Sequence, residues 1–479
     1  MIQEWNDKTM IINNMKKIIL FAFLLSGFVF AAEGNAPHLN GADLSIFWVF
    51  PFAGILLSIA IFPLVAPDFW HHNFGKISAF WAILLIVPFL LKVGFTITLY
   101  ELLHVGLLEY VPFIILLLAL FTISGGVQLK GALVGTPIVN TGIIFIGTAL
   151  ASWMGTTGAA MLLIRPLIRA NKERKSKVHV IVFFIFLVAN IGGSLTPLGD
   201  PPLFLGFLKG VNFFWTTSAM MVPMLFMVFS LLIIFFIFDS YLYKKENIKK
   251  EETDIKISIE GSFNLLLLLG VIGSVLLSGF WRPHIEFELF YVHVELQNVI
   301  RDILLLSLTF ASWKLTSSKI REANEYTWFP IVEVAKLFAG IFVTIIPAIA
   351  ILKAGTSGAL GVVINSVSNQ TGPINYMYFW ATGILSSFLD NAPTYLVFFN
   401  TAGGDPIQLM GELSQTLLAI SAGAVFMGAN TYIGNAPNFM VKSISESSGI
   451  EMPSFFGYLF KWSLPILFPL FIIVTFLFF

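Results

Sequence analysis

The stretch GGSLTPLGDPPL, residues 192–203, places an aspartate among glycines and prolines within an otherwise apolar run. A second stretch, FMGANTYIGNAPN at 426–438, carries glycine, threonine, glycine and proline at equivalent positions, and Asn435 there matches Asp200. Glycine and proline interrupt helices, so each stretch predicts a broken helix. Unpaired backbone groups of a broken helix cannot face lipid and must lie in protein or along a water-filled cavity.

A second pair of windows has the same spacing. SWMGTTGAAML at 152–162 matches SFLDNAPTYLV at 387–397, and both pairs of windows are offset by 235 residues. Glycine and proline are common in membrane helices, so one match would be weak. Two windows with one offset predict an internal repeat.

Composition defines the protein class. Of 479 residues, 57% are hydrophobic and 11% are charged, and the mean hydropathy is +0.87, which predicts an all-α polytopic membrane protein. The 27 basic and 27 acidic residues balance, so no net charge favours nucleic acid as a partner. The absence of cysteine excludes disulfides and thiolate sites. Seven histidines form no ligand pair with a carboxylate, and His71 and His72 are expected in a connecting loop. We therefore expect no cofactor, no metal beyond Na⁺ and no enzyme activity.

The N-terminus resembles an export signal. From Met15, MKKIILFAFLLSGFVFAAEG has two lysines, a short apolar core and small residues before Ala32. We expect residues 1–32 to be an extension with a cleaved signal, which leaves the mature N-terminus outside a bacterial-type inner (plasma) membrane. A retained first membrane helix is the alternative.

Ten apolar spans are expected, at about 44–66, 78–98, 110–129, 178–210, 214–240, 262–281, 300–316, 329–352, 413–441 and 455–479. Three basic loops, RANKERKSK (169–177), YKKENIKKEE (243–252) and SSKIREANEY (317–326), share one side only if two segments enter the membrane and return. The arms 139–153 and 159–169 are too short, at ~1.5 Å per residue, to cross a ~30 Å layer. Re-entrant helical hairpins are therefore predicted at about 137–169 and 376–400.

Two inverted-topology repeats follow from this tracing. The first covers 44–240 with its broken helix at 178–210, and the second covers 262–479 with its broken helix at 413–441. Residues 241–261 form a cytoplasmic linker. Paired broken segments in inverted repeats are typical of secondary transporters, whose sites lie at mid-membrane between the repeats.

The candidate site residues lie at these breaks and hairpin tips. A carboxylate at Asp200 or Asp390 can bind a cation or take up a proton, although each residue could instead cap the helix that follows it. Neutral oxygens come from Thr196, Asn391, Asn430, Thr431, Asn435 and Ser194. The hairpin tips contribute Ser152, Gly155, Thr156, Thr157 and Ser387, and the helix breaks contain Gly193, Gly199, Pro201, Pro202, Gly434 and Pro437.

At these residues the chain resembles a known group. SSFLDNAPTYLVFFN (386–400) and GGSLTPLGDPPLFLG (192–206) are similar to hairpin and broken-helix motifs of the ion transporter superfamily, which includes NhaD-type sodium/proton antiporters, citrate and dicarboxylate symporters and arsenite carriers. The resemblance covers about residues 44–479 and looks closest to the citrate-transporter-like branch. It implies an elevator-type movement and a homodimer. It also implies ion-binding roles for Asp200 and Asp390, which match acidic positions of NhaD-type members.

Three functions are weighed. Na⁺/H⁺ antiport by alternating access is the leading interpretation, with a small inorganic cation as the partner. The alternative is Na⁺- or H⁺-coupled transport of citrate or a dicarboxylate. The tips GTTG and LDNAP lack, however, the Ser-Asn-Thr signature that dicarboxylate symporters share at both hairpin tips. An intramembrane aspartyl protease is the remote alternative, because Pro197 stands where the glycine of such proteases is required.

Overall fold

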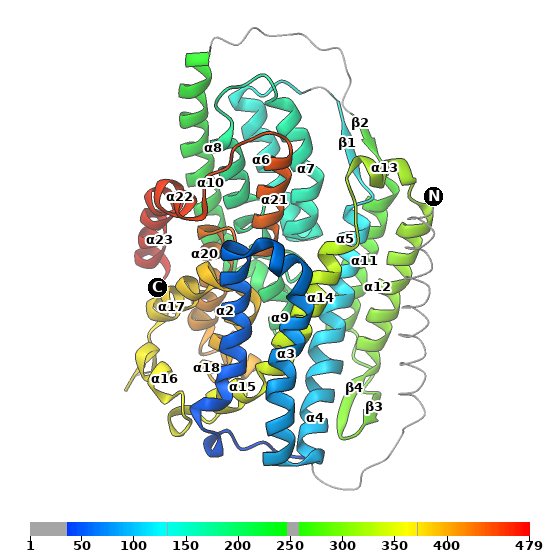
Figure 1. Cartoon of the computed structure of the whole chain (residues 1–479), viewed down its shortest axis with the longest axis vertical. Helices are drawn as coiled ribbons and strands as arrows, with labels where there is room; N and C mark the ends of the chain where they lie inside the picture. The colour runs from blue at the N-terminus through cyan, green and yellow to red at the C-terminus, as the bar shows by residue number, and fades with distance from the viewer. Residues whose placement is uncertain (1–35, 132, 247–257, 371) are drawn as a thin grey trace.

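The computed structural model describes residues 36–131, 133–246, 258–370 and 372–479. Within these ranges the chain is nearly all helical, with three short two-stranded antiparallel ribbons (Figure 1). Eight of the described helices are long and apolar enough to cross a membrane, and a ninth counts if a bent pair is one span. The protein is therefore a polytopic helical membrane protein. The N-terminal signal predicted within residues 1–32 and the middle of the 241–261 linker lie outside the described residues.

The first helices form one side of the molecule. They are α2 (Phe50–Val65), α3 (Pro67–Val93), α4 (Phe95–Val105), the π-helical turn η3 (Gly106–Tyr110) and α5 (Val111–Ser124), preceded by the turns η1 (Gly41–Asp43) and η2 (Ile46–Val49). Pro67 starts α3, and Gly94 ends it with φ of +87°. The expectation of a loop at His71 and His72 is wrong, because both lie in the first turns of α3. The chain turns at Ala66 instead, one residue before the proline that starts the helix.

A second group of helices packs against the first. It comprises α11 (Phe263–Phe280), α12 (Leu296–Leu315), α13 (Ser318–Ala323), α14 (Phe329–Thr344) and α15 (Ile346–Lys353). The helix α12 contacts α5 and α11, and α14 contacts α3. The ribbon of β1 (Gln128–Lys130) and β2 (Ser258–Glu260) joins α5 to α11, with Leu129 opposite Ile259. The ribbon of β3 (Glu286–Leu289) and β4 (Val292–Glu295) joins α11 to α12.

The interior is built from two further groups. The first contains α6 (Pro137–Met154), α7 (Thr156–Ala170), α8 (Val178–Leu187), the turn η4 (Ile191–Leu195), α9 (Pro201–Leu208) and α10 (Phe213–Glu246). The second contains α17 (Asn375–Phe388), α18 (Asn391–Thr401), α19 (Pro406–Met410), α20 (Ser414–Met427), the turn η6 (Gly428–Asn430), α21 (Ala436–Ser447), α22 (Phe455–Tyr458), the π-helical turn η7 (Leu459–Ser463) and α23 (Leu464–Phe478). The short elements η5 (Gly355–Ser357), α16 (Gly361–Val367), β5 (Ser368–Asn369) and β6 (Gly372–Pro373) precede α17.

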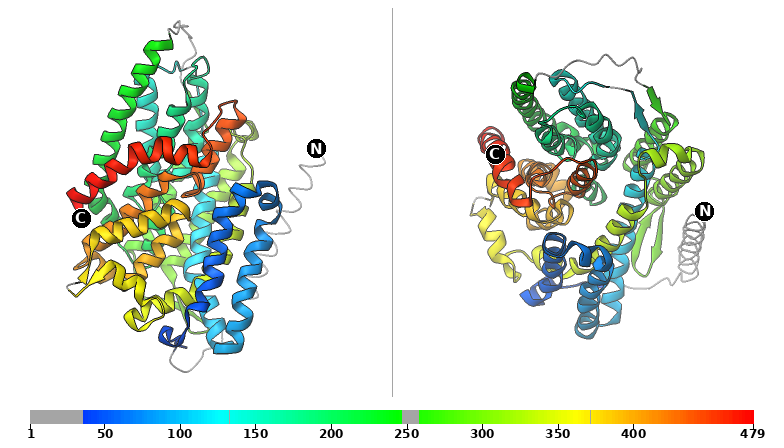
Figure 2. Two further views of the ribbon diagram at one scale, coloured as in Figure 1. Left: turned by 60° about the vertical axis from the view of Figure 1, so that its left-hand side comes forward. Right: turned by 45° about the horizontal axis from the view of Figure 1, so that its top comes forward.

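The two interior groups interlock. The helix α7 of the first group contacts α21 of the second, and α18 of the second contacts α9 of the first. In both views of Figure 2 the teal and orange-red segments that include α7 and α21 lie close together, and the blue helices α2 and α3 lie at the edge of the molecule. Apart from His179 the helix α8 is apolar all round, and it is buried from His179 to its end, as expected of a helix enclosed by others. In contrast, only about a fifth of the most apolar window of α3 is buried, so α3 offers its surface to lipid.

The spans mostly coincide with the expected ones. The helix α12 is present, but Arg301, Asp302 and Lys314 make it too polar for a simple span, and α20 has only 14 residues before its break. The first hairpin arm, α6, has 18 residues, more than expected, and is long enough to cross a membrane. The re-entrant character of α6 and α7 therefore remains a prediction.

A buried polar cluster fixes α10 to the interior. The carboxylate of Asp239 on α10 is fully buried and lies 2.5 Å from a guanidinium nitrogen of Arg174 and 2.7 Å from Nε2 of His179. The amide of Asn140 on α6 donates to the other carboxylate oxygen at 3.0 Å. Because its partners come from the segment before α8, from α8 itself and from α6, this carboxylate holds four parts of the chain together.

Candidate functional site

The two broken helices have the same construction. In the first break, a Cβ on Gly199 would lie 2.1 Å from the carbonyl oxygen of Gly193, so only glycine fits. In the second break, a Cβ on Gly434 would lie 2.5 Å from the carbonyl oxygen of Gly428. Gly193 and Gly428 are themselves equivalent in the two matched windows. The predicted glycines thus allow the chain to fold back on itself at both breaks.

Each break is fastened to a hairpin tip by the same pair of side chains. Ser152 donates to the carbonyl of Gly192 at 2.5 Å, and Thr196 donates to the carbonyl of Ser152. Equivalent bonds join the other tip and break, because Ser387 donates to the carbonyl of Met427 at 3.0 Å and Thr431 donates to the carbonyl of Ser387 at 2.5 Å. The residues that form the two sets of bonds differ in number by 235, which is the offset of the matched sequence windows.

Asp200 lies where the two groups meet. Its carboxylate is 1% exposed, and it receives hydrogen bonds from both groups of helices. The amide of Asn391 donates to Oδ2 at 2.6 Å and the amide of Asn435 donates to Oδ1 at 2.9 Å. Thr156 donates to Oδ1 at 3.3 Å. Asn435 is the residue that the repeat matches with Asp200, so matched positions touch each other directly.

The electrostatics of this contact are unusual for a buried carboxylate. Every donor to Asp200 is neutral, and neither Asp200 nor Asp390 has an ion-pair partner in the part of the chain that the structure describes. Within the same described ranges, the buried Oδ1 of Asn391 has no hydrogen-bond partner. The amide oxygen of Asn391 and the carboxylate of Asp200 are therefore two neighbouring acceptors that could both bind a cation.

Asp390 is placed differently. It is half-buried, and its Oδ1 accepts from the backbone nitrogen of Ala392 at 3.0 Å, so it caps α18 as the capping alternative predicts. Asp200 precedes α9 but makes no such cap. The two carboxylates are close enough to interact electrostatically. Each carboxylate accepts its own set of hydrogen bonds, Asp200 from side chains and Asp390 from the backbone of Ala392.

The remaining predicted residues lie on the same framework. Gly155, the match of Asp390, has φ of +80° at the tip between α6 and α7. The prolines Pro201, Pro202 and Pro437 lie in the first turns of α9 and α21. Asn430 donates to Ser387 at 2.9 Å, and Ser194 donates to the carbonyl of Ile191 at 2.7 Å. Thr157 is half-buried in the first turn of α7.

Two asparagines that sequence reasoning did not select join the breaks. Asn190 donates to Oδ1 of Asn438 at 2.7 Å, and Asn438 donates to the carbonyls of Gly428 and Thr431 at 2.9 and 2.8 Å. Both residues are fully buried. The available signal was their place beside the motifs, since Asn190 lies two residues before Gly192 and Asn438 directly follows Pro437.

The arrangement can hold a hard monovalent cation. It offers a carboxylate, amide oxygens and hydroxyls, and unwound backbone at both breaks, which are the oxygen donors that such ions prefer. No group of three or more His, Asp or Glu side chains able to hold a metal ion occurs in the described ranges.

A polytopic helical protein with two equivalent broken helices around one buried carboxylate belongs to the class of membrane transporters. The sequence matches a family described as "Putative citrate transport" over residues 41–479, which is nearly the whole chain. The chain belongs to this family, and so is a citrate-transporter-like membrane transporter. A comparison with curated proteins gives no match.

Proposed function

We propose that this protein is a secondary active transporter that exchanges Na⁺ for protons, and that Asp200 is the exchanging group. The observation that supports the proposal is the environment of the Asp200 carboxylate, which is buried and receives hydrogen bonds only from neutral side chains. An ionised carboxylate without a counter-ion costs several kcal/mol when it is buried. Binding either a proton or a cation removes that cost.

The two ways of neutralising Asp200 exclude each other, and this exclusion couples the ions. A protonated carboxyl group no longer attracts a cation, and a bound cation displaces the proton. If the site is exposed to the two sides of the membrane in turn, each cycle carries a cation one way and a proton the other. Asp390 contributes a second carboxylate at the other hairpin tip, close enough to interact with Asp200.

Coupled citrate transport is the second candidate, because the family is described by citrate. A cation at Asp200 would offset the charge of an anion nearby. No side chain caps the start of α7, and although Thr156 N–H donates to the carbonyl of Gly199, the next N–H groups of this turn can serve a carboxylate. In this scheme the cation and the anion move in the same direction.

Vesicles containing the purified protein and a pH-sensitive dye distinguish the two candidates. With an acidic lumen, Na⁺ added outside is expected to raise the lumen pH, and Li⁺ and K⁺ test selectivity. Accumulation of labelled citrate without Na⁺-driven proton movement would refute the exchange and support the second candidate.

A matched pair of variants tests the second carboxylate. Asp390→Asn removes a charge but keeps a side chain that can cap α18. Asp405 caps α19 by the same bond, accepting from the backbone nitrogen of Ile407 at 2.9 Å. We expect Asp390→Asn to reduce exchange strongly and Asp405→Asn to leave it unchanged. Equal effects of the two substitutions would assign Asp390 a capping role alone.

We also propose, from the resemblance and the span tracing, a homodimer in the lipid bilayer of a bacterial-type plasma membrane with the mature N-terminus outside. Cross-linking in the membrane tests the dimer, and N-terminal accessibility tests the orientation.

A further inference from the structure

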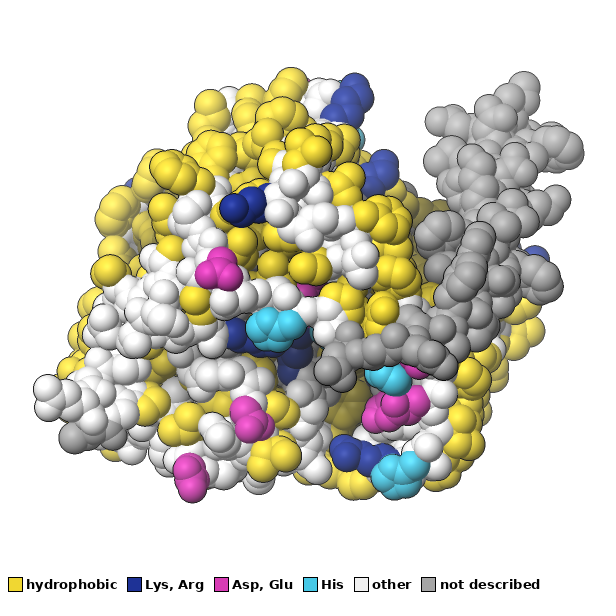
Figure 3. Space-filling view, turned by 90° about the horizontal axis from the view of Figure 1, so that it is seen from below, with side chains coloured by type: hydrophobic (Ala, Val, Ile, Leu, Met, Phe, Trp, Pro, Cys, Tyr) yellow, Lys and Arg dark blue, Asp and Glu magenta, His cyan; other side chains and the backbone are white. Residues whose placement is uncertain are grey.

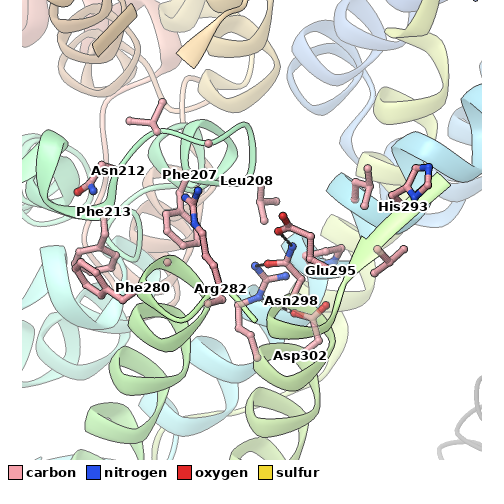
Figure 4. Close-up of a pocket in the computed structure, with 18 of the residues that line it drawn as sticks. Phe207, Leu208, Asn212, Phe213, Phe280, Arg282, His293, Glu295, Asn298 and Asp302 are labelled. Carbon is pink, nitrogen blue, oxygen red and sulfur yellow. Dashed lines mark hydrogen bonds and ion pairs between the residues drawn. The ribbon is translucent and has the colours of Figure 1, made fainter. Parts of the chain in front are cut away.

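A cavity of about 480 Å³ opens at one end of the molecule, beside the β3–β4 ribbon. The opposite end carries the connection between α7 and α8 (Figure 1). Figure 4 shows Phe207 and Leu208 on one side of the cavity, Glu295 and Asn298 on the other, and Arg282 between them. Figure 3 looks onto this end, where Lys and Arg side chains gather in a hollow near the middle of the face.

The inner wall of this cavity is a contact between two different parts of the chain. Leu107 and Leu108 line it from η3, and Phe207 and Leu208 line it from the end of α9. Glu109 directly follows Leu108, and Lys209 directly follows Leu208. The two residues form an ion pair, in which Lys209 Nζ contacts Glu109 Oε1. The ion pair therefore lies next to the cavity, where η3 meets α9.

This ion pair is enclosed. The Glu109 side chain is 4% exposed and the Lys209 side chain is 19% exposed. The second carboxylate oxygen of Glu109 is buried and has no hydrogen-bond partner within the described ranges. Glu101 and Lys353 are further charged side chains that interact with the pair. Removing either partner would leave the other charge nearly buried without compensation, which is strongly destabilising.

The helix α9 links this ion pair to the ion site. Asp200 occupies the position before its first residue, and Lys209 occupies the position after its last residue. Nine residue steps at ~1.5 Å each separate Asp200 from Lys209 by about 13.5 Å along the helix axis. A rigid helix of this length transmits a displacement at one end to the other. The state of the Lys209–Glu109 contact is therefore mechanically connected to Asp200.

The two sides of the contact belong to different groups of helices. Lys209 is attached to α9, which packs on α18 and α20 around the site. Glu109 lies in a π-helical turn of the continuous rod α4–η3–α5, whose neighbours include α3, α12 and α14. Single π-helical turns inside helices are frequent at functional positions.

We propose that Lys209 and Glu109 form a gate that closes the Asp200 site on the side of the cavity, and that the pair separates once in every transport cycle. Asp200 is 1% exposed here, so an ion reaches it only after some contact opens. The end of α9 lines the cavity, and the start of the same helix adjoins Asp200. The proposal depends on transport through the Asp200 site, but not on which ion is carried.

Reversible cross-linking tests the gate, and the natural absence of cysteine makes the experiment clean. In a Glu109→Cys/Lys209→Cys variant in vesicles, a short reducible bis-methanethiosulfonate reagent should join the two thiols. We expect transport to fall in proportion to the cross-linked fraction and to return after reduction. Mass spectrometry of the joined peptides measures that fraction. Cross-linked protein that transports as fast as uncross-linked protein would overturn the proposal.

A second ion pair supplies the matched control. Lys130 Nζ lies 2.7 Å from Glu260 Oε1 and joins β1 to β2, which connect α5 and α11. Cross-linking a Lys130→Cys/Glu260→Cys variant is expected to leave transport unchanged, because both residues lie outside the helices around Asp200. Single-cysteine variants treated with the same reagent control for modification alone.

Charge variants test the gate without a cross-linker. Leu205→Cys places a thiol on the buried face of α9, and Lys209→Gln is expected to raise its rate of labelling by an impermeant maleimide about tenfold. The reversed pair Glu109→Lys/Lys209→Glu should restore slow labelling and transport. An unchanged labelling rate in Lys209→Gln, or no restoration by the reversed pair, contradicts a gate.

The two proposals fail in different ways. If wild-type vesicles carry citrate without Na⁺/H⁺ exchange, the exchange is refuted, and the gate is tested on citrate flux with the same variants. If exchange is present but unaffected by the cross-link, the gate alone is refuted.

Discussion

Replacing Asp200 with asparagine separates the roles of charge and shape at the site. The side chains have the same size, but an amide offers one acceptor oxygen where the carboxylate accepts from Asn391, Asn435 and Thr156. One buried donor then faces the new NH₂ group, at a cost of about 1–3 kcal/mol. Removing a buried charge that has no counter-ion offsets this cost. We therefore expect the free energy of unfolding to change little.

Cation binding should respond far more strongly than stability. At an effective dielectric constant of about 20, a carboxylate oxygen about 2.4 Å from a monovalent cation contributes about 7 kcal/mol of attraction. Dehydration of the cation offsets part of this, and a net loss of about 3 kcal/mol corresponds to binding about 100-fold weaker. Asp200→Asn should therefore lose Na⁺-driven proton movement at concentrations that saturate the wild type.

Two measurements check this prediction. Na⁺ titration of the dye-loaded vesicles gives the apparent affinity for Na⁺ during transport. Thermal unfolding of the detergent-solubilised protein gives binding without transport, because a ligand at 100 times its Kd stabilises the wild type by about 2.7 kcal/mol. The variant should show no stabilisation by Na⁺ at the same concentration. An apparent Na⁺ affinity within about threefold of the wild type would refute the placement of the cation at Asp200.

Three further predictions concern the framework. Ser152→Ala and Ser387→Ala each remove a buried bond between a tip and a break, so each should lower the free energy of unfolding by about 1–3 kcal/mol, measured by thermal unfolding. Gly155→Ala has room for its Cβ, but φ of 80° with ψ of 147° borders a region that only glycine occupies readily, so the substitution should cost about 1–3 kcal/mol. Gly199→Ala forces a Cβ to 2.1 Å from a backbone oxygen and should abolish folded protein in size-exclusion chromatography. Asp239→Asn leaves a buried guanidinium without its closest partner and should destabilise by about 3–5 kcal/mol while leaving the ion selectivity of the remaining folded protein unchanged, as vesicle flux can test.

Much of the architecture could be predicted because its signals are local. Glycines and prolines mark the breaks in the chain itself, so the positions of η4, η6 and the two hairpin tips were accessible from sequence. The same is true of Asp390, whose place before NAPTYL predicts the cap that it forms.

Other features depend on packing between distant segments. The windows predict that Asp200 and Asn435 are equivalent, but the contact between them exists only because the two groups interlock face to face. Arg174 was part of a basic loop by sequence, yet it is 4% exposed because its partner Asp239 comes from α10. The first helices were also displaced from their expected bounds, since an aromatic, His-containing start to α3 has no simple apolar pattern.

The direct contact between Asp200 and Asn435 has an evolutionary consequence. If one ancestral segment was duplicated, the residue at this position first faced its own copy. Two aspartates there would have repelled each other, and two asparagines would have carried no charge to exchange. A single carboxylate held by an amide arises only after the two copies differ at this position. The asymmetry between Asp200 and Asn435 is therefore younger than the duplication itself.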